Sequence, residues 1–201
     1  MKKIVVCVSG GGTDLQSIID GVENGSIKAG ISLVISSRHG VFAEKRAEKH
    51  GIPYIVVSKT DYPDKKELYS EMLRILDEIE PDLIVLAGYV SILPPEIIDK
   101  YRGKIINIHP SLIPKHCGKG YYGLKVHESV LASGDTESGV TVHFVDEGAD
   151  TGKIIRQEKV AVLPGDTPES LQQRVLCVEH KVLPEVVASL VNGSGDSDKR
   201  Q

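Results

Sequence analysis

Short apolar runs rich in β-branched residues recur along the first part of the chain, each of a length that suits one strand. The pattern predicts strands over residues 4–9, 31–36, 54–57, 83–87 and 105–109. Segments with apolar residues three or four positions apart lie between these runs, and the clearest covers residues 64–80. Because strands alternate with helices, we expect an α/β fold with a mostly parallel, Rossmann-like sheet and helices on both faces.

The pattern changes after Gly139. Two strand-like segments, residues 141–145 and 154–162, are separated by an acidic turn that is too short for a crossover helix. We therefore expect these segments to pair antiparallel with each other at the end of the sheet.

The last helix and the tail set the domain boundaries. Thr167 and Pro168 suit the N-cap and the first position of a helix. The ten residues from 192 to 201 lack apolar side chains and are expected to form a flexible tail. With 201 residues and 40% hydrophobic content, the chain can bury one sizeable core, so we expect a single domain over residues 1–191.

Composition excludes several classes of protein. The formal net charge is −4 and the charges are interspersed, unlike the basic surface of a nucleic-acid binder. No apolar run approaches the ~20 residues of a membrane span, and the N-terminal apolar run is too short for a signal peptide. The three cysteines are widely spaced and lack metal-ligand spacing with the histidines, which favours a reduced, cytoplasmic protein without a zinc site.

Polar residues interrupt the fifth predicted strand. Asn107 and His109 lie two positions apart, so on an extended strand they project from the same face. Pro110 cannot donate to a sheet ladder, so the strand should end with this pair. An amide, an imidazole and a carboxylate could together perform acid–base and oxyanion chemistry. Spacing alone does not choose the carboxylate, because the later acidic turn contains Asp146, Glu147 and Asp150.

A glycine cluster, Gly10–Gly12, follows the first predicted strand and precedes a helix. Free backbone N–H groups at such a helix start suit a phosphate. The cluster is not a Walker A loop, and Leu15 occupies the third glycine position of the dinucleotide-binding pattern. Arg38 and the serines before it could bind a 2′-phosphate, so an NADP oxidoreductase stays open as an alternative. A tight turn without a ligand and a non-catalytic phosphoribosyl-binding module are further alternatives.

Several longer motifs carry a resemblance to a known family. From Ile4 to Leu190 the chain contains, in order, VSGGGTDLQSIID, VLAGYVSIL, INIHPSLIP, HFVDEGADTGKII, VLPGDT and EH. With these motifs it resembles the phosphoribosylglycinamide formyltransferases, a folate-dependent formyltransferase family. Formyltransferases that act on tRNA share the Asn-x-His-Pro-Ser core but look longer, and formyltetrahydrofolate deformylases carry an added N-terminal domain. The length of this chain favours the purine-synthesis branch.

The resemblance implies an activity and its substrates. Members of the family transfer the formyl group of 10-formyltetrahydrofolate to the amine of N1-(5-phospho-D-ribosyl)glycinamide in de novo purine biosynthesis. The family implies small-molecule substrates, a cytoplasmic location, no metal, and neither a nucleic acid nor a membrane as partner. Whether the chain forms a homodimer is left open.

The resemblance also assigns site residues. The catalytic residues are Asn107, His109 and Asp150. The residues that bind phosphoribosylglycinamide are Gly12, Thr13, Asp14 and Glu179. The residues that bind the folate are Lys66, Val90, Ser91, Ile92, Leu93, Asp146, Glu147, Gly148 and Ala149.

The resemblance implies a mechanism, and the chain departs from the family pattern at two positions. Asp150 should raise the pKa of His109, so that a protonated His109 and Asn107 both donate hydrogen bonds to the oxygen of a tetrahedral intermediate. Asp14 stands where the family usually has asparagine, which places a carboxylate near a phosphate. Ser91 stands where an arginine is frequent, so a contact with the folate tail is in question.

Overall fold

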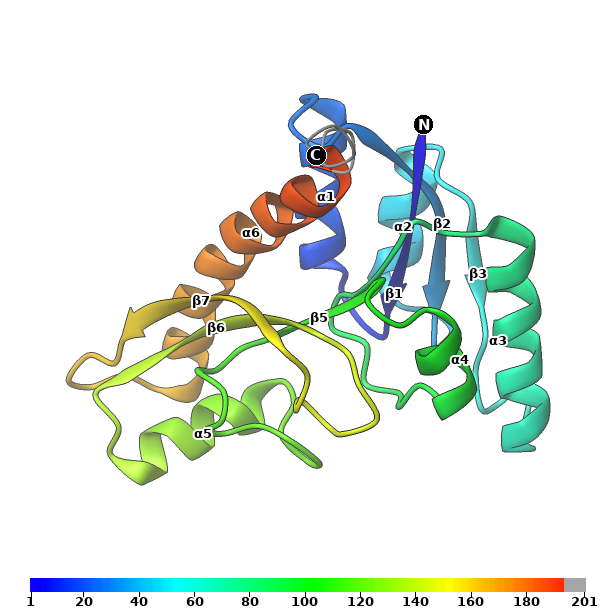
Figure 1. Ribbon diagram of the computed structural model, residues 1–201. Coiled ribbons are helices and arrows are strands. Elements are labelled where there is room, and N and C mark those ends of the chain that lie inside the picture. The colour runs from blue at the N-terminus through cyan, green and yellow to red at the C-terminus, as the bar shows by residue number, and fades with distance from the viewer. Residues whose placement is uncertain (194–201) are drawn as a thin grey trace, which may run out of the picture.

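The computed structural model describes residues 1–193 of the chain. Seven strands form one sheet in the order β3-β2-β1-β4-β5-β6-β7 (Figure 1). The strands are β1 (Lys2–Val8), β2 (Ala29–Ser36), β3 (Tyr54–Val56), β4 (Leu83–Leu86), β5 (Ile105–His109), β6 (Glu137–Phe144) and β7 (Ile154–Ala161). The helices are α1 (Thr13–Glu23), α2 (Phe42–Lys49), α3 (Lys65–Ile79), α4 (Pro95–Lys100), α5 (Leu124–Ser133) and α6 (Pro168–Asn192).

Strands β1 to β5 are parallel, and β6 and β7 run antiparallel at the end of the sheet. The predicted fold class is therefore confirmed. The predicted antiparallel pairing of β6 with β7 is also confirmed, but β6 pairs with β5 as well and begins at Glu137 rather than at residue 141. Gly139 lies in this added stretch, where a Cβ atom would lie 2.2 Å from the Glu158 carbonyl oxygen. Close packing therefore requires glycine at this position. Because glycine interrupts the apolar pattern of the segment, the sequence does not show that the strand begins before it.

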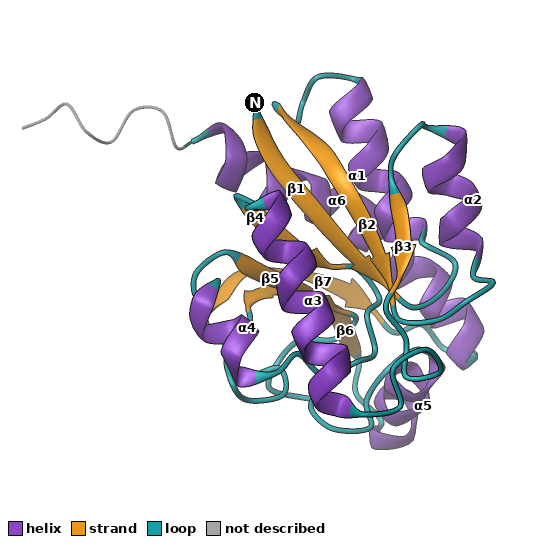
Figure 2. Ribbon diagram, turned by 90° about the vertical axis from the view of Figure 1, so that its right-hand side faces the viewer, coloured by secondary structure: helices purple, strands orange, loops and turns teal. Residues whose placement is uncertain are grey.

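Helices cover both faces of the sheet, because the parallel strands are buried on both sides. Along β1, Ile4 and Val6 pack in one core with residues of α1, α2 and α6. Val5 and Cys7 alternate with them and pack in a second core with residues of α3 and α4. Figure 2 shows α3 in front of the sheet and α1 and α6 behind it.

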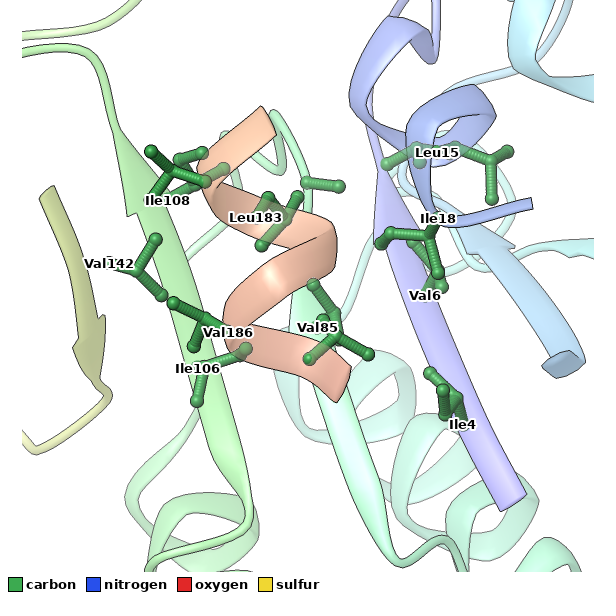
Figure 3. Close-up of a cluster of buried hydrophobic side chains, with 14 of the residues drawn as sticks. Ile4, Val6, Leu15, Ile18, Val85, Ile106, Ile108, Val142, Leu183 and Val186 are labelled. Atoms are coloured by element: carbon green, nitrogen blue, oxygen red, sulfur yellow. The ribbon is translucent and has the colours of Figure 1, made fainter. Parts of the chain in front are cut away.

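Helix α6 joins the parallel and antiparallel parts of the first core. Leu183 and Val186 are buried in the same core as Val85 and Ile106, and Figure 3 shows α6 passing over the sheet with Val186 close to Val85 and Ile106. The predicted start of this helix is confirmed, since Thr167 caps it and accepts a hydrogen bond from the Ser170 N–H.

The end of the described chain is anchored. Asn192 was expected in the tail, but it ends α6, and its side chain binds backbone groups of Ser26 and Lys28. The remainder of the predicted tail, residues 194–201, lies outside the described residues. Within residues 1–193, no helix is both long and apolar enough to cross a membrane.

The sheet order positions two candidate ligand-binding segments. From β1 the chain builds the sheet outward in one direction through β2 and β3, and it then continues on the other side of β1 with β4 and β5. The strand order therefore reverses between β1 and β4. Ligands of open α/β sheets bind outside the carboxyl ends of the strands at such a point. The glycine cluster follows β1 and the Asn107–His109 pair ends β5, so both lie at the carboxyl edge of the sheet.

Candidate active site

The structure brings Asn107, His109 and Asp150 together. The amide Nδ2 of Asn107 donates to Asp150 Oδ1 over 3.3 Å, and His109 Nδ1 lies 3.6 Å from Asp150 Oδ2. His109 is 4% exposed, and Asp150 is only partly exposed. Of the three acids in the loop after β6, Asp150 is thus the one that contacts the polar pair of β5.

His143 belongs to the same cluster, and sequence analysis missed it. It lies directly opposite Asn107 in the antiparallel pair of β5 and β6. Its Nδ1–H donates to the Phe144 carbonyl over 2.8 Å, so its Nε2 accepts from the Asn107 amide over 3.2 Å. Both hydrogens of the Asn107 amide are therefore engaged, one with His143 and one with Asp150. The pairing of β5 with β6 was the missing signal, because it places His143 opposite Asn107.

Two backbone groups complete the cluster. The His116 carbonyl lies 2.9 Å from His109 Nε2, and a carbonyl can only accept, so Nε2 carries the hydrogen. The Gly118 N–H donates to Asp150 Oδ2 over 2.8 Å. In neutral His109 the lone pair is consequently on Nδ1, the nitrogen that faces Asp150.

The pKa of His109 differs from the sequence-based expectation. Burial lowers it below its ordinary value, while the His116 carbonyl and the charge of Asp150 act in the opposite direction. The contribution expected from Asp150 is present, but burial is the largest effect and decides the direction. The net direction of the His109 pKa is therefore opposite to the one expected, because spacing along the sequence does not show how deeply the imidazole is buried.

Asp150 remains a carboxylate. Burial raises its pKa, but the contacts with His143, His109 and the Gly118 N–H together outweigh burial and lower it. The site thus holds a neutral imidazole beside a charged carboxylate, an arrangement in which a proton gained by Nδ1 is stabilised at once.

The glycine cluster is shaped by α2. Gly12 has φ +70, and a Cβ there would lie 2.8 Å from the Cβ of Ala43. Arg46, also on α2, donates through Nε to the Gly11 carbonyl over 2.9 Å. A Cβ at Gly10 or Gly11 would meet no atom within 4 Å, so the outer side of the cluster is open. A pocket of about 380 Å³ begins beside the cluster and is lined in part by Thr13, Gln16, Arg46 and His180.

Asp14 and Glu179 form a buried acidic pair behind the glycine cluster. They are 8% and 5% exposed. Burial raises the pKa of Asp14 to about 6, and burial and the charge of Asp14 raise that of Glu179 well above its ordinary value. Asp14 Oδ1 and His180 Nε2 lie 3.8 Å apart, and neither atom has a hydrogen-bond partner among residues 1–193.

The residues assigned to the folate lie in three separate segments. Lys66 is exposed at the start of α3. In the loop after β4, Val90 and Ile92 are 43% and 73% exposed, while Leu93 is buried and Ser91 is partly exposed.

The third folate segment is the acidic loop after β6. The side chain of Asp146 accepts from the Gly148 N–H and the Thr151 hydroxyl, so it shapes the loop from within. Glu147 pairs with Arg102 at 2.5 Å, and Ala149 is exposed. Within residues 1–193, no group of three or more His, Cys, Asp or Glu side chains is arranged to hold a metal ion.

Residues 2–187 match a protein family described as formyl transferase. The chain belongs to the formyl transferase family. The resemblance seen in the sequence motifs is thus confirmed over most of the chain. Ser36, which an NADP site would have used, binds the Arg38 carbonyl through its hydroxyl instead.

Named relatives refine the comparison. This formyl transferase is 43% identical over 195 residues to the trifunctional purine biosynthetic protein adenosine-3 of Drosophila melanogaster, covering 96% of the chain but 14% of that protein. The chain therefore spans only a small part of the insect protein. It is 40% identical over 193 residues to the phosphoribosylglycinamide formyltransferase of Haemophilus influenzae, covering 96% of the chain and 89% of the relative. Glycinamide ribonucleotide transformylase 1 of Geobacillus kaustophilus has the same fold, with a TM-score of 0.88 and 40% identity over 95% of this chain and 99% of that one.

Proposed function

We propose that this formyl transferase moves the formyl group of 10-formyltetrahydrofolate to the amine of N1-(5-phospho-D-ribosyl)glycinamide. The observation that carries the proposal is the cluster of Asn107, His109 and Asp150 at the carboxyl end of β5. Relatives named for this reaction have the same fold and about 40% identity, which supports the choice of substrates.

His109 acts as a base in the proposed reaction. The substrate amine attacks the formyl carbon, which gives a tetrahedral intermediate with a negatively charged oxygen and a positively charged nitrogen. The Nδ1 lone pair of neutral His109 takes a proton from that nitrogen, and Asp150 stabilises the imidazolium that forms. The same proton then passes to N10 of the folate as the carbon–nitrogen bond breaks, which returns His109 to its neutral form.

Asn107 stabilises the oxyanion. One of its amide hydrogens is held by His143 at 3.2 Å and the other by Asp150 at 3.3 Å. In the proposed reaction the developing oxyanion competes for the amide hydrogen that now contacts Asp150. His143 keeps the amide oriented during this exchange, so the donor is already aligned when charge develops.

The glycine cluster holds the phosphate in this proposal. Its outer side is open, and its backbone N–H groups precede the positive end of α1. Glu179, which is buried and interacts with the charge of Asp14, is assigned to the ribose. The exposed apolar side chains Val90 and Ile92 offer a surface for the folate ring system, with Lys66 and the acidic loop as the other assigned contacts.

The direct test mixes the purified protein with the ribonucleotide and 10-formyltetrahydrofolate. Formylated ribonucleotide and deformylated folate should appear in equal amounts, as measured by mass spectrometry and by folate absorbance. A reaction without the ribonucleotide controls for hydrolysis. Folate loss that does not depend on the ribonucleotide would refute transfer, and oxidation of NADPH would support the oxidoreductase alternative.

The pH dependence of kcat distinguishes a neutral from a protonated His109. We expect kcat to be level near neutral pH and to fall in acid, because protonation removes the lone pair on Nδ1. The apparent pKa of this fall should lie below ~6.5, the ordinary value for histidine. Measurement at saturating substrate separates the effect from binding. A kcat that rises as the pH falls would mean that the imidazolium is the active form.

Replacing Asp150 with asparagine should lower kcat by ~10-fold or more and leave KM for both substrates nearly unchanged. The amide removes the negative charge that stabilises the imidazolium, but it occupies the same volume. Steady-state kinetics on both substrates give the result. Asp99→Asn, which changes an exposed carboxylate of α4, is the matched control. An effect on KM alone would assign Asp150 to folate positioning.

A further inference from the structure

One short segment, residues 115–118, contacts both members of the His109–Asp150 pair. The His116 carbonyl accepts from His109 Nε2–H over 2.9 Å, and the Gly118 N–H donates to Asp150 Oδ2 over 2.8 Å. Both contacts use backbone atoms. The lengths and angles of these two hydrogen bonds therefore depend on the interactions that fix the backbone path of residues 115–118.

The side chain of His116 fixes that path. Its Nδ1 lies 2.8 Å from the Ser129 hydroxyl on α5, and its Nε2 lies 2.8 Å from Asp135 Oδ2 just beyond that helix. The side chain is 12% exposed and both ring nitrogens are engaged. The backbone of His116 is left-handed, with φ +52, a conformation that non-glycine residues adopt only when the surroundings hold them there.

The position of the His116 carbonyl decides which nitrogen of His109 carries the hydrogen. With the carbonyl in place, the hydrogen is on Nε2 and the lone pair on Nδ1 faces Asp150. Without it, the best acceptor near His109 is the Asp150 carboxylate, and the hydrogen would move to Nδ1. The lone pair would then lie on Nε2, on the side of the ring away from Asp150.

We propose that Asp135 is a positioning residue for catalysis, which acts through His116 to hold His109 in the Nε2–H tautomer. The hydrogen bonds of Asp135 go to Lys115 and His116 rather than to Asn107, His109 or Asp150. It fixes the His116 ring, the ring fixes its own carbonyl, and the carbonyl fixes the tautomer. The catalytic part of this inference rests on the proposed formyl transfer, whereas the tautomer itself does not.

The charge of Asp135 suits this role. The hydrogen bond with His116 and then that with Lys115 lower the pKa of its carboxyl to about 2, so it is ionised wherever the protein is folded near neutral pH. A carboxylate can only accept, so His116 Nε2 always donates to it. Lys115 also contacts Asp135, at 2.9 Å, but its side chain is 67% exposed and leaves the His116 ring untouched.

Four variants separate the roles of these groups. Asp135→Ala removes the acceptor, and His116→Asn removes the ring while keeping a residue that tolerates a left-handed backbone. Both should lower kcat by ~10-fold to 10²-fold with little change in KM, since a small displacement of a catalytic group has effects of that size. Asp135→Asn keeps an oxygen that can accept from His116 and should restore most of kcat. Lys115→Ala, the matched control, should behave as the unmodified protein.

The tautomer is read directly by nitrogen NMR of histidine-labelled protein at about pH 7.5, well above the ordinary histidine pKa of ~6.5. Signals of His109 are identified by their loss in His109→Gln. We expect the Nε2–H form in the unmodified protein, Lys115→Ala and Asp135→Asn, and a shift to the Nδ1–H form in Asp135→Ala and His116→Asn. An unchanged tautomer in these last two variants overturns the proposal, as does a loss in Lys115→Ala equal to that in Asp135→Ala. If the unmodified protein fails to transfer formyl groups, the proposed function falls, but the NMR result still decides the tautomer.

Discussion

Replacing His109 with alanine should lower kcat by ~10²-fold or more, the largest loss expected for a side chain of this protein. In the proposed reaction the change removes the Nδ1 lone pair that takes the amine proton. It also removes the imidazole that lies 3.6 Å from the Asp150 carboxylate and contacts the His116 carbonyl. Single groups that stabilise a transition state are typically worth ~10²-fold to 10³-fold in kcat. Single-turnover measurements with saturating folate isolate the chemical step.

Asn107→Ala should give a loss of similar size for a different reason. The amide donates to the oxyanion, so its removal raises the energy of the tetrahedral intermediate and leaves the pH profile of kcat unchanged. His109→Ala should instead abolish the fall of kcat in acid. His39→Ala, which removes an exposed histidine that pairs with Asp61, is a control that should keep full activity. Near-normal turnover in Asn107→Ala or His109→Ala, with an unchanged thermal unfolding transition, would exclude that residue from the mechanism.

Asp14→Asn is expected to stabilise the folded protein above about pH 6. Burial raises the pKa of Asp14 from 3.8 to about 6, so the folded state binds a proton that the unfolded state releases. The stabilisation from this proton is complete below pH ~4 and is lost as the pH rises through about 6. Asparagine never carries the charge, so the variant avoids that loss. At ~1.4 kcal/mol for each tenfold change in proton affinity, the gain in unfolding free energy approaches 3 kcal/mol.

Urea unfolding at two pH values checks the sign. The gain should be present at about pH 7.5 and close to zero at pH ~3, below the unfolded pKa of 3.8, where Asp14 is protonated in both the folded and unfolded states. Asp20→Asn, an exposed change on the same helix, should stay within ~0.5 kcal/mol at both pH values. An equal gain at both pH values would show that shape or hydrogen bonding, and not the charge of Asp14, is responsible.

The elements of the fold were readable from the sequence because the parallel strands are mostly apolar runs, with β5 interrupted by its polar pair, and the clearest helix, α3, has an apolar stripe. One feature of the strand order was not readable. The pairing of β5 with β6 joins segments that lie far apart in the sequence, and no local pattern of residues reports such a pairing. His143 therefore looked like an ordinary strand residue, although it lies opposite Asn107.

The chemistry of the site was readable in part. Periodicity placed Asn107 and His109 on one face, and the family resemblance selected Asp150, which the structure places beside them. The contacts from His116 and Gly118 use backbone atoms, which every residue has, so no side-chain pattern announces them. The direction of the His109 pKa depends on burial, and burial is a property of the assembled core.

Helix α6 connects the glycine cluster to the strands that carry Asn107 and His109, and so constrains the distance between these two parts of the site. One part of it places Glu179 beside Asp14 and the glycine cluster, and the next turns pack Leu183 and Val186 against the strands that carry the catalytic cluster. In the proposed function, the phosphate end and the amine end of the site are therefore both attached to α6 and its packing. We expect a substrate that is one methylene longer between phosphate and amine to carry its nitrogen past His109. The proposed enzyme would then select substrates by their span as well as by their functional groups.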